Sequence, residues 1–272
     1  MALSDVSEIL SRGGVLPDRA AVVTIDDGYR NTITAALPVL EAMSIPATVF
    51  VPAGMAGGPG ILWFDGLRLL VLWSLERQAV VDLGAGVIVD GRRSIGPEAI
   101  FLEAGAAVHA LPSAPAAAVK AGIHARCAEA GLTERHAEFH LAGWDEWRRA
   151  TRPGLLQVGS HALEHGDLTK MTGEEQVQDL AASRQRIEEE LGTRCLALAY
   201  PYGYVNAEVV GSAARAGYAC AVTTEPGLSG PRHPPLLLHR TMAGDKGSQA
   251  IFAARVSGAW PPGRSREVCA CG

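Results

Sequence analysis

The chain has 272 residues, of which 48% are hydrophobic, so it can bury a full core as one large α/β domain or two small ones. Its formal net charge of −5 gives no basic footprint for nucleic acid or an anionic membrane. No segment approaches the roughly 20 uninterrupted apolar residues that span a bilayer. The stretch from Met1 to Gly14 shows no signal-peptide pattern, and the five cysteines fit reduced thiols, so we expect a cytoplasmic protein.

The first predicted element is a buried strand over residues 21–25, which ends at Asp26, Asp27 and Gly28. Reactive groups of α/β enzymes lie in loops at the carboxyl ends of such strands. Adjacent strand residues point to opposite faces, so one acid can hold a metal while its neighbour handles a proton. The alternative is a plain turn in which an aspartate serves as cap.

A helix and a second strand follow and complete a βαβ unit. Asn31 can cap a helix that runs to about Met43, and residues 47–52 form another buried strand. This order implies a parallel sheet.

The segment 54–152 then changes character, and we interpret it as an insertion within a single domain that spans residues 1–272. We predict a helix over 61–78, a hairpin over 80–93 and helical structure over 97–131.

A second candidate site follows the next predicted strand, residues 155–160. His161 and His165 are four residues apart, which places two imidazoles on one side of a turn, close enough to bind one ion. His136 and His140 have the same spacing inside a predicted helix, where we interpret them as part of a solvated helix face.

Strands and helices alternate again over the rest of the chain. Thr172 and Glu175 form a capping box that opens a helix to Leu191, and Asn206 caps another to Ala216. Further strands are predicted over 195–199, 219–224 and 236–240, and a last helix over 249–256. About seven strands in βα units indicate a barrel-like parallel sheet. The terminal Cys269 and Cys271 lack a second cysteine pair that would complete a soft metal site.

With these motifs taken together, the chain resembles the polysaccharide deacetylase family, also called the NodB-homology or carbohydrate esterase family four domain. Thr24-Ile25-Asp26-Asp27-Gly28 looks like its first motif, and Gly159-Ser160-His161-Ala162-Leu163-Glu164-His165 looks like its metal-histidine motif. Ala199-Tyr200-Pro201-Tyr202-Gly203 is similar to the third motif of the branch that reads tyrosine-proline-tyrosine-glycine there.

The resemblance implies a distorted (β/α) barrel with one divalent ion, zinc or else cobalt or nickel, held by Asp27, His161 and His165. It implies that Asp26 is the general base that takes a proton from the attacking water. It also implies that the backbone N–H of Tyr202 helps to stabilise the tetrahedral oxyanion. Family members remove an acetyl group from an N-acetylated sugar.

The chain departs from the commonest family pattern where many members carry an arginine that orients the base, because this position is Ala199. Arg240 is our candidate for the missing cation, and we expect its guanidinium within about 4 Å of Asp26; the alternative is a surface ion pair. His239 is the candidate proton donor for the leaving amine, or else a packed histidine at a strand end. Because neighbours on a strand face opposite ways, we expect His239 to be farther from the metal than Arg240 is from Asp26.

The function expected from these residues is N-deacetylation of a small N-acetylated sugar or sugar conjugate. One alternative is a metal-dependent amidohydrolase for an N-formyl, imide or ureide substrate. The other is a catalytically silent relative that binds a glycan or a partner.

Overall fold

The computed structural model describes residues 1–58, 60–230, 233–243 and 248–257. They form two compact units, of which the first holds Met1–Ala56 and the described residues from Ala142 onward, and the second holds Gly57–Leu141. The second unit lies within the segment predicted as an insertion, whereas residues 142–152 belong to the first unit. The pair Cys269 and Cys271 lies outside the described residues.

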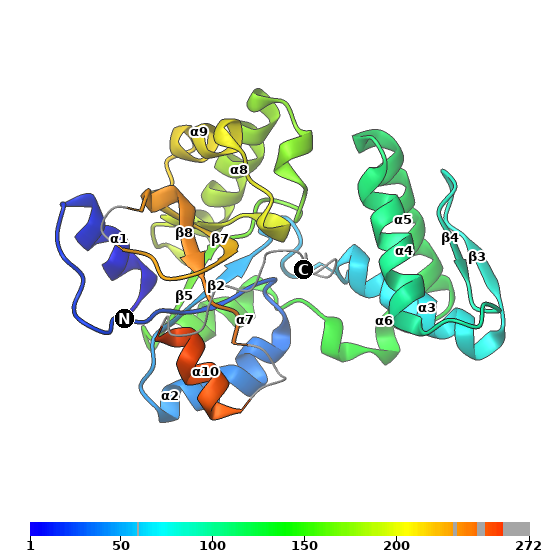
Figure 1. Cartoon of the computed structure of the whole chain (residues 1–272), viewed down its shortest axis with the longest axis horizontal. Helices are drawn as coiled ribbons and strands as arrows, with labels where there is room; N and C mark the ends of the chain where they lie inside the picture. The colour runs from blue at the N-terminus through cyan, green and yellow to red at the C-terminus, as the bar shows by residue number, and fades with distance from the viewer. Residues whose placement is uncertain (59, 231–232, 244–247, 258–272) are drawn as a thin grey trace. The chain divides into compact units, whose positions relative to one another are not determined.

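The first unit is built on a curled parallel sheet, which confirms the expected (β/α) barrel fold in an open, half-barrel form (Figure 1). Among the described residues this sheet has six strands rather than about seven. In spatial order they are β1 (Val23–Ile25), β2 (Ala47–Val51), β5 (Leu156–Ser160), β6 (Ala197–Ala199), β7 (Cys220–Pro226) and β8 (Leu238–Arg240). Every neighbouring pair is parallel, so all carboxyl ends lie at one edge of the sheet.

Strand β2 shows why this sheet is buried on both faces. Its five residues, Ala-Thr-Val-Phe-Val, are all buried, as expected for a parallel strand covered on two sides. Val49 and Val51 face one core, which contains Leu180 of α8, and Phe50 faces another, which contains Leu3 of α1. The alternation of side chains along the strand therefore sends its apolar residues into both cores.

Helices and short helical turns connect the strands of this unit. They are α1 (Leu3–Ser11), the π-helical turn η1 (Thr32–Ala36), α2 (Leu37–Ala42), α7 (Trp144–Thr151), η3 (Leu168–Lys170), α8 (Gly173–Leu191), η4 (Pro201–Gly203), α9 (Ala207–Arg215), η5 (Pro235–Leu237) and α10 (Gln249–Val256).

Two predicted helix starts are confirmed and one is wrong. The Thr172 side chain accepts from the N–H of Glu175, and Asn206 accepts from the N–H of Val209. Asn31 makes no side-chain cap, because its own backbone is already helical and the chain continues into a π-helical turn.

The second unit is helical with one antiparallel hairpin. Its elements are α3 (Trp63–Arg77), β3 (Val80–Asp82), β4 (Ile88–Asp90), α4 (Pro97–Ala110), α5 (Ser113–Glu129), α6 (Leu132–Arg135) and η2 (Ala137–Phe139). The predicted hairpin is confirmed, and Pro112 separates α4 from α5 within the predicted helical segment. His136 and His140 flank a 3₁₀ turn rather than sharing one helix face, which corrects the helix predicted there.

Two further properties concern the described residues of both units. No helix in the part of the chain that the structure describes is long and apolar enough to cross a membrane. Cys127, Cys195 and Cys220 are buried and unbridged.

Candidate active site

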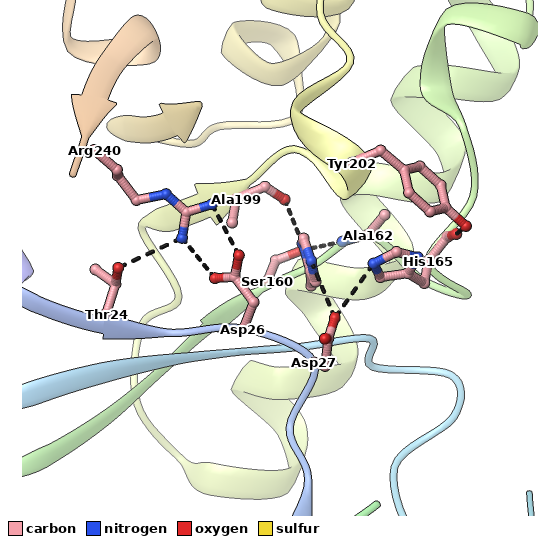
Figure 2. A network of polar contacts seen from close by, with 10 residues as sticks. Thr24, Asp26, Asp27, Ser160, Ala162, His165, Ala199, Tyr202 and Arg240 are labelled. Carbon is pink, nitrogen blue, oxygen red and sulfur yellow. Dashed lines mark hydrogen bonds and ion pairs between the residues drawn. The ribbon is translucent and has the colours of Figure 1, made fainter. Parts of the chain in front are cut away.

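The two acids of the first motif separate because the backbone turns between them. Asp26 and Asp27 directly follow β1, and Asp27 has a left-handed φ of 73°. Gly28, with φ of 71°, continues this turn at a position where a Cβ would lie 3.1 Å from the Val51 side chain. The turn directs Asp27 toward the histidines and leaves Asp26 facing Arg240 (Figure 2).

Asp27, His161 and His165 form a buried cluster. Their donor atoms lie within 4.8 Å of one another, and no residue of the three is more than 7% exposed. The Nε2 atoms of His161 and His165 lie 3.5 and 3.3 Å from the same oxygen, Asp27 Oδ1. They come together because the ends of β1 and β5 both lie beside the end of β2.

These residues fit a divalent metal ion. Asp27 Oδ1 is a buried carboxylate oxygen without a hydrogen bond of standard geometry, an arrangement that is costly unless a cation is bound there. His161 Nδ1 lies 2.8 Å from the carbonyl of Ala199 and must donate to it, which leaves the Nε2 lone pair directed toward Asp27. Two imidazoles and one carboxylate form the donor set typical of a catalytic zinc site with open positions.

The electrostatics of the cluster favour an ionised Asp27 and a neutral His165, as a metal requires, whereas His161 would have to give up a proton when a metal binds. Burial raises the pKa of Asp27, but the hydrogen bonds and positive charge of His161 and His165 outweigh it and hold this pKa below the ordinary value. Burial and the charge of His161 lower the pKa of His165, which favours the neutral imidazole that a metal needs. Burial lowers the pKa of His161, but Asp27 and Asp26 together raise it above the ordinary value.

Arg240 pairs with Asp26, as the sequence predicted. The guanidinium makes two hydrogen bonds to the carboxylate, from Nη1 to Oδ1 at 2.7 Å and from Nη2 to Oδ2 at 2.8 Å (Figure 2). Its Nε donates to the carbonyl of Thr223 at 2.9 Å, which fixes the plane of the fork. Asp26 follows β1 and Arg240 ends β8, so the pair joins the two outer strands and depends on the curl of the sheet.

Ala199 contributes to the site in a different way from the arginine that the commonest family pattern has at this position. Its side chain is buried in the core beside α1, and its carbonyl orients His161. The cation at Asp26 therefore comes from another strand, and the alternative in which Arg240 pairs at the surface is wrong.

His239 lies against a loop at the edge of the sheet. Its ring is 4.7 Å from that of His233, and its backbone N–H donates to Ser229 Oγ. A Cβ on Gly227 would lie 2.9 Å from His239 Nδ1, so this glycine permits the close approach of the ring. The predicted position of His239 relative to the metal stays a prediction.

Tyr202 adopts an unusual conformation beside His165. Its φ of 59° and that of Gly203, 70°, make two consecutive left-handed residues in η4. The phenol donates to the carbonyl of His165 at 3.3 Å, and the two rings meet edge to face at 4.6 Å. The third motif therefore contacts the segment that carries the histidines.

Three residues near the histidines make contacts that the sequence did not predict. Ser160, Asp179 and Ser183 hydrogen-bond to the backbone between His161 and His165. A signal was available, since Asp179 and Ser183 are polar residues four apart next to the apolar face of α8 that contains Leu180 and Ile187.

The chain belongs to the polysaccharide deacetylase family, because the model of that family, described as polysaccharide deacetylase, matches residues 13–74 and 116–221. A curated relative named "Putative polysaccharide deacetylase YxkH", from Bacillus subtilis (strain 168), is 28% identical over 101 residues. That match covers 37% of this chain and 36% of the relative, so it spans little more than a third of the relative's length.

Several solved structures share the fold, and two of those described below are named as deacetylases. The Streptococcus pyogenes deacetylase PplD, in complex with acetate, has a TM-score of 0.52 and 16% identity, over 88% of this chain and 70% of that one. A polysaccharide deacetylase from Bacillus cereus has a TM-score of 0.55 and 17% identity, over 93% and 60%. IcaB from Ammonifex degensii has a TM-score of 0.52 and 16% identity, over 94% and 87%. At these identities the likeness concerns the fold.

Proposed function

We propose that the protein is a metal-dependent hydrolase that removes the acetyl group from an N-acetylated sugar and releases acetate and a free amine. The observation that carries this proposal is a buried donor set, Asp27, His161 and His165, next to a second carboxylate, Asp26, that is held by two hydrogen bonds from Arg240. Membership of the polysaccharide deacetylase family supports it.

Asp27, His161 and His165 would hold one divalent ion, zinc in the first place and cobalt or nickel as alternatives. When bound, the ion would polarise the amide carbonyl and make a nearby water more acidic. The protein contributes the dry, preorganised donor set, with the tautomer of His161 fixed by the Ala199 carbonyl.

Asp26 would act as the general base that takes the proton from the attacking water. The Arg240 fork keeps the carboxylate in one orientation and favours its ionised form, as a base requires. We further propose that the backbone N–H of Tyr202, in the strained turn η4, stabilises the oxyanion of the tetrahedral intermediate. We assign no proton transfer to His239, because its ring packs against the ring of His233 and the backbone at Gly227.

The substrate that we propose to test first is a small N-acetylated sugar or nucleotide sugar, and the predicted cytoplasmic location belongs to the same proposal. N-acetylated oligosaccharides form the second arm of the test, because the family and the curated relative are named for polysaccharides.

The deciding experiment measures acetate release from both substrate sets by zinc- or cobalt-loaded full-length protein, with N-formyl and cyclic imide substrates alongside. We expect acetate from at least one N-acetylated sugar and none after chelation or in His161→Ala. Turnover of the formyl or imide substrates alone would instead assign a different amidohydrolase. Metal binding without any turnover would assign a silent relative.

A further inference from the structure

The segment Ser160–His165, which we call the histidine loop, has a backbone conformation that is unfavourable for its residues. Ala162 has φ of 61° and His165 has φ of 53°, and neither is glycine. Left-handed residues other than glycine are sterically unfavourable, so they persist only where the surroundings fix them. The distance between the two histidine rings depends on this conformation.

Two side chains of α8 fix the loop from outside the metal site. Asp179 Oδ1 accepts the N–H of Leu163 at 2.9 Å. Ser183 Oγ, which is buried, donates to the carbonyl of Ala162 at 2.9 Å. The backbone between His161 and His165 is therefore hydrogen-bonded to a helix that carries no metal ligand among its described residues.

The directions of these hydrogen bonds follow from counting hydroxyl protons. Ser183 has one proton, and it goes to Ala162, so in the 2.7 Å contact between the two serines Ser160 must donate. Ser160 Oγ is then free to accept the N–H of Ala162, which lies 3.2 Å away (Figure 2). The result is a closed ring in which Ser160, Ser183 and Ala162 each donate and accept, and such rings reinforce their members.

We propose that Asp179 and Ser183 are positioning residues of the metal site, which set the geometry of His161 and His165 by holding the left-handed loop between them. The inference rests on the proposed metal site, but it assigns a role to α8 that the metal ligands alone do not imply. The alternative is that both residues only attach α8 to the sheet. The two cases differ in whether metal affinity falls by more than the stability of the fold accounts for.

The test compares four variants of the full-length protein by Zn²⁺ affinity, by the visible absorption of bound Co²⁺ and by metal-free stability. Ser183→Ala and Asp179→Ala should lower Zn²⁺ affinity about 10- to 100-fold, the usual effect of removing a group that orients a ligand. They should also change the Co²⁺ spectrum, because the ring geometry changes. Asp179→Asn keeps an acceptor oxygen and should restore the affinity to within about threefold of wild type.

Ser212→Ala is the matched control. Ser212 is as buried as Ser183, but its hydroxyl donates to Gln176 rather than to the histidine loop. This variant should lose stability to a similar extent and keep the wild-type affinity and spectrum. If Ser183→Ala does not fold, the Asp179 pair decides the question, since Asp179 is only partly buried.

Wild-type affinity and spectrum in Asp179→Ala would overturn the inference, as would affinity losses that simply follow stability across all four variants. A wild-type protein that binds neither Zn²⁺ nor Co²⁺ would overturn it as well. Bound Zn²⁺ without acetate release would refute the proposed function alone, because the affinity measurements use no substrate.

Discussion

Asp26 and Asp27 are neighbours in the chain, yet Asp26 faces the guanidinium of Arg240 and Asp27 faces the imidazoles of two histidines. The left-handed backbone at Asp27 makes this possible, because it turns the chain between the two carboxylates after the end of β1. Asp26 remains 30% exposed in its side chain and can reach a substrate, whereas Asp27 is buried with the histidines. This difference in exposure agrees with the proposed roles, in which Asp26 takes a proton from water and Asp27 binds a metal in a buried site.

Removing the charge of Asp26 tests its role directly. Asp26→Asn should bind Zn²⁺ like wild type and lose about 10²-fold or more in turnover, because an amide cannot accept the proton of the attacking water. Metal content and acetate release are measured on the same sample. Near wild-type turnover with retained metal would mean that Asp26 is structural.

Replacing Arg240 tests whether the fork or only its charge matters. Arg240→Lys keeps the charge but cannot make both hydrogen bonds to Asp26, and we expect a roughly 10- to 100-fold loss of turnover, from about 1.5–3 kcal/mol for a charged hydrogen bond. Arg30→Lys, which breaks the comparable pair with Glu146, serves as the control and should leave turnover within about threefold of wild type. Equal losses in both variants would show an effect on stability rather than on the base.

At the scale of secondary-structure elements, the turn η4 depends on a glycine that cannot be replaced without steric conflict. Gly203 has φ of 70°, and a Cβ there would lie 1.9 Å from Thr224 Oγ1 on β7. Gly192 at the end of α8 has nearly the same φ, 67°, with open space around it. Substitutions at the two glycines can therefore be compared to separate the cost of the backbone conformation from the cost of a steric clash.

We therefore expect Gly192→Ala to lower the free energy of unfolding by about 1 kcal/mol and to leave acetate release unchanged. Gly203→Ala should cost clearly more and abolish activity, because η4 must move away from β7 and Tyr202 moves with it. Denaturant unfolding and the acetate assay give both quantities. Similar values for the two variants would show that the packing of η4 against β7 is not restrictive.

Helix α8 carries a carboxylate whose ionisation opposes folding. Burial raises the pKa of Asp179 from 3.8 to about 6, against the hydrogen bond from Leu163. The folded state thus binds its proton more tightly than the unfolded state, so the contribution of Asp179 to stability is present at low pH and is lost as the pH rises through about 6.

The neutral variant Asp179→Asn should escape this loss. In metal-free protein, its gain in unfolding free energy over wild type should be larger at about pH 7.5 than at about pH 4.5. Denaturant titrations of both proteins at the two pH values measure it. A gain that does not change with pH would mean that Asp179 titrates normally in the fold.

Elements with local signals were predictable from the sequence, and those that depend on distant partners were not. The capping residues Thr172 and Asn206 and the hairpin within 80–93 involve neighbours in the chain, and all are confirmed. Helix α1 was not predicted, since it has nine residues without a side-chain cap and is stabilised by burying Leu3 and Val6 in a core of the sheet.

The same distinction holds for the site. The candidate metal cluster could be predicted because strand ends of a parallel sheet meet at one edge. The pairing of Arg240 with Asp26 could be predicted because a charge in a cleft needs a partner. The contacts of Asp179 and Ser183 with the backbone of the histidine loop were not predicted. Their spacing on α8 placed both residues near the sheet, but the left-handed residues that they hold leave no mark in the sequence.

At the scale of the whole molecule, the first unit encloses its own apolar interior. As far as the structure describes the chain, both cores of the sheet consist of residues from Met1–Ala56 and from Ala142 onward. The second unit has its own buried positions, among them Leu67 of α3, Phe101 of α4 and Ile123 of α5. We propose that residues 57–141 are an insertion that folds around this second interior.

The buried thiols give each unit a built-in chemical reporter. Burial raises the pKa of Cys127, in the second unit, to about 12, and in the first unit it raises the pKa of Cys195 to about 12 and of Cys220 to about 11. At neutral pH these groups are almost entirely thiols, which iodoacetamide attacks only slowly, and burial shields them further. Alkylation at each position, followed by peptide mass spectrometry, should therefore proceed only when the surrounding unit opens. Different labelling rates at Cys127 and at the other two cysteines would show that the units unfold separately. One common rate would show a single cooperative transition. Rapid labelling of these three cysteines in the native protein would contradict the burial of their side chains.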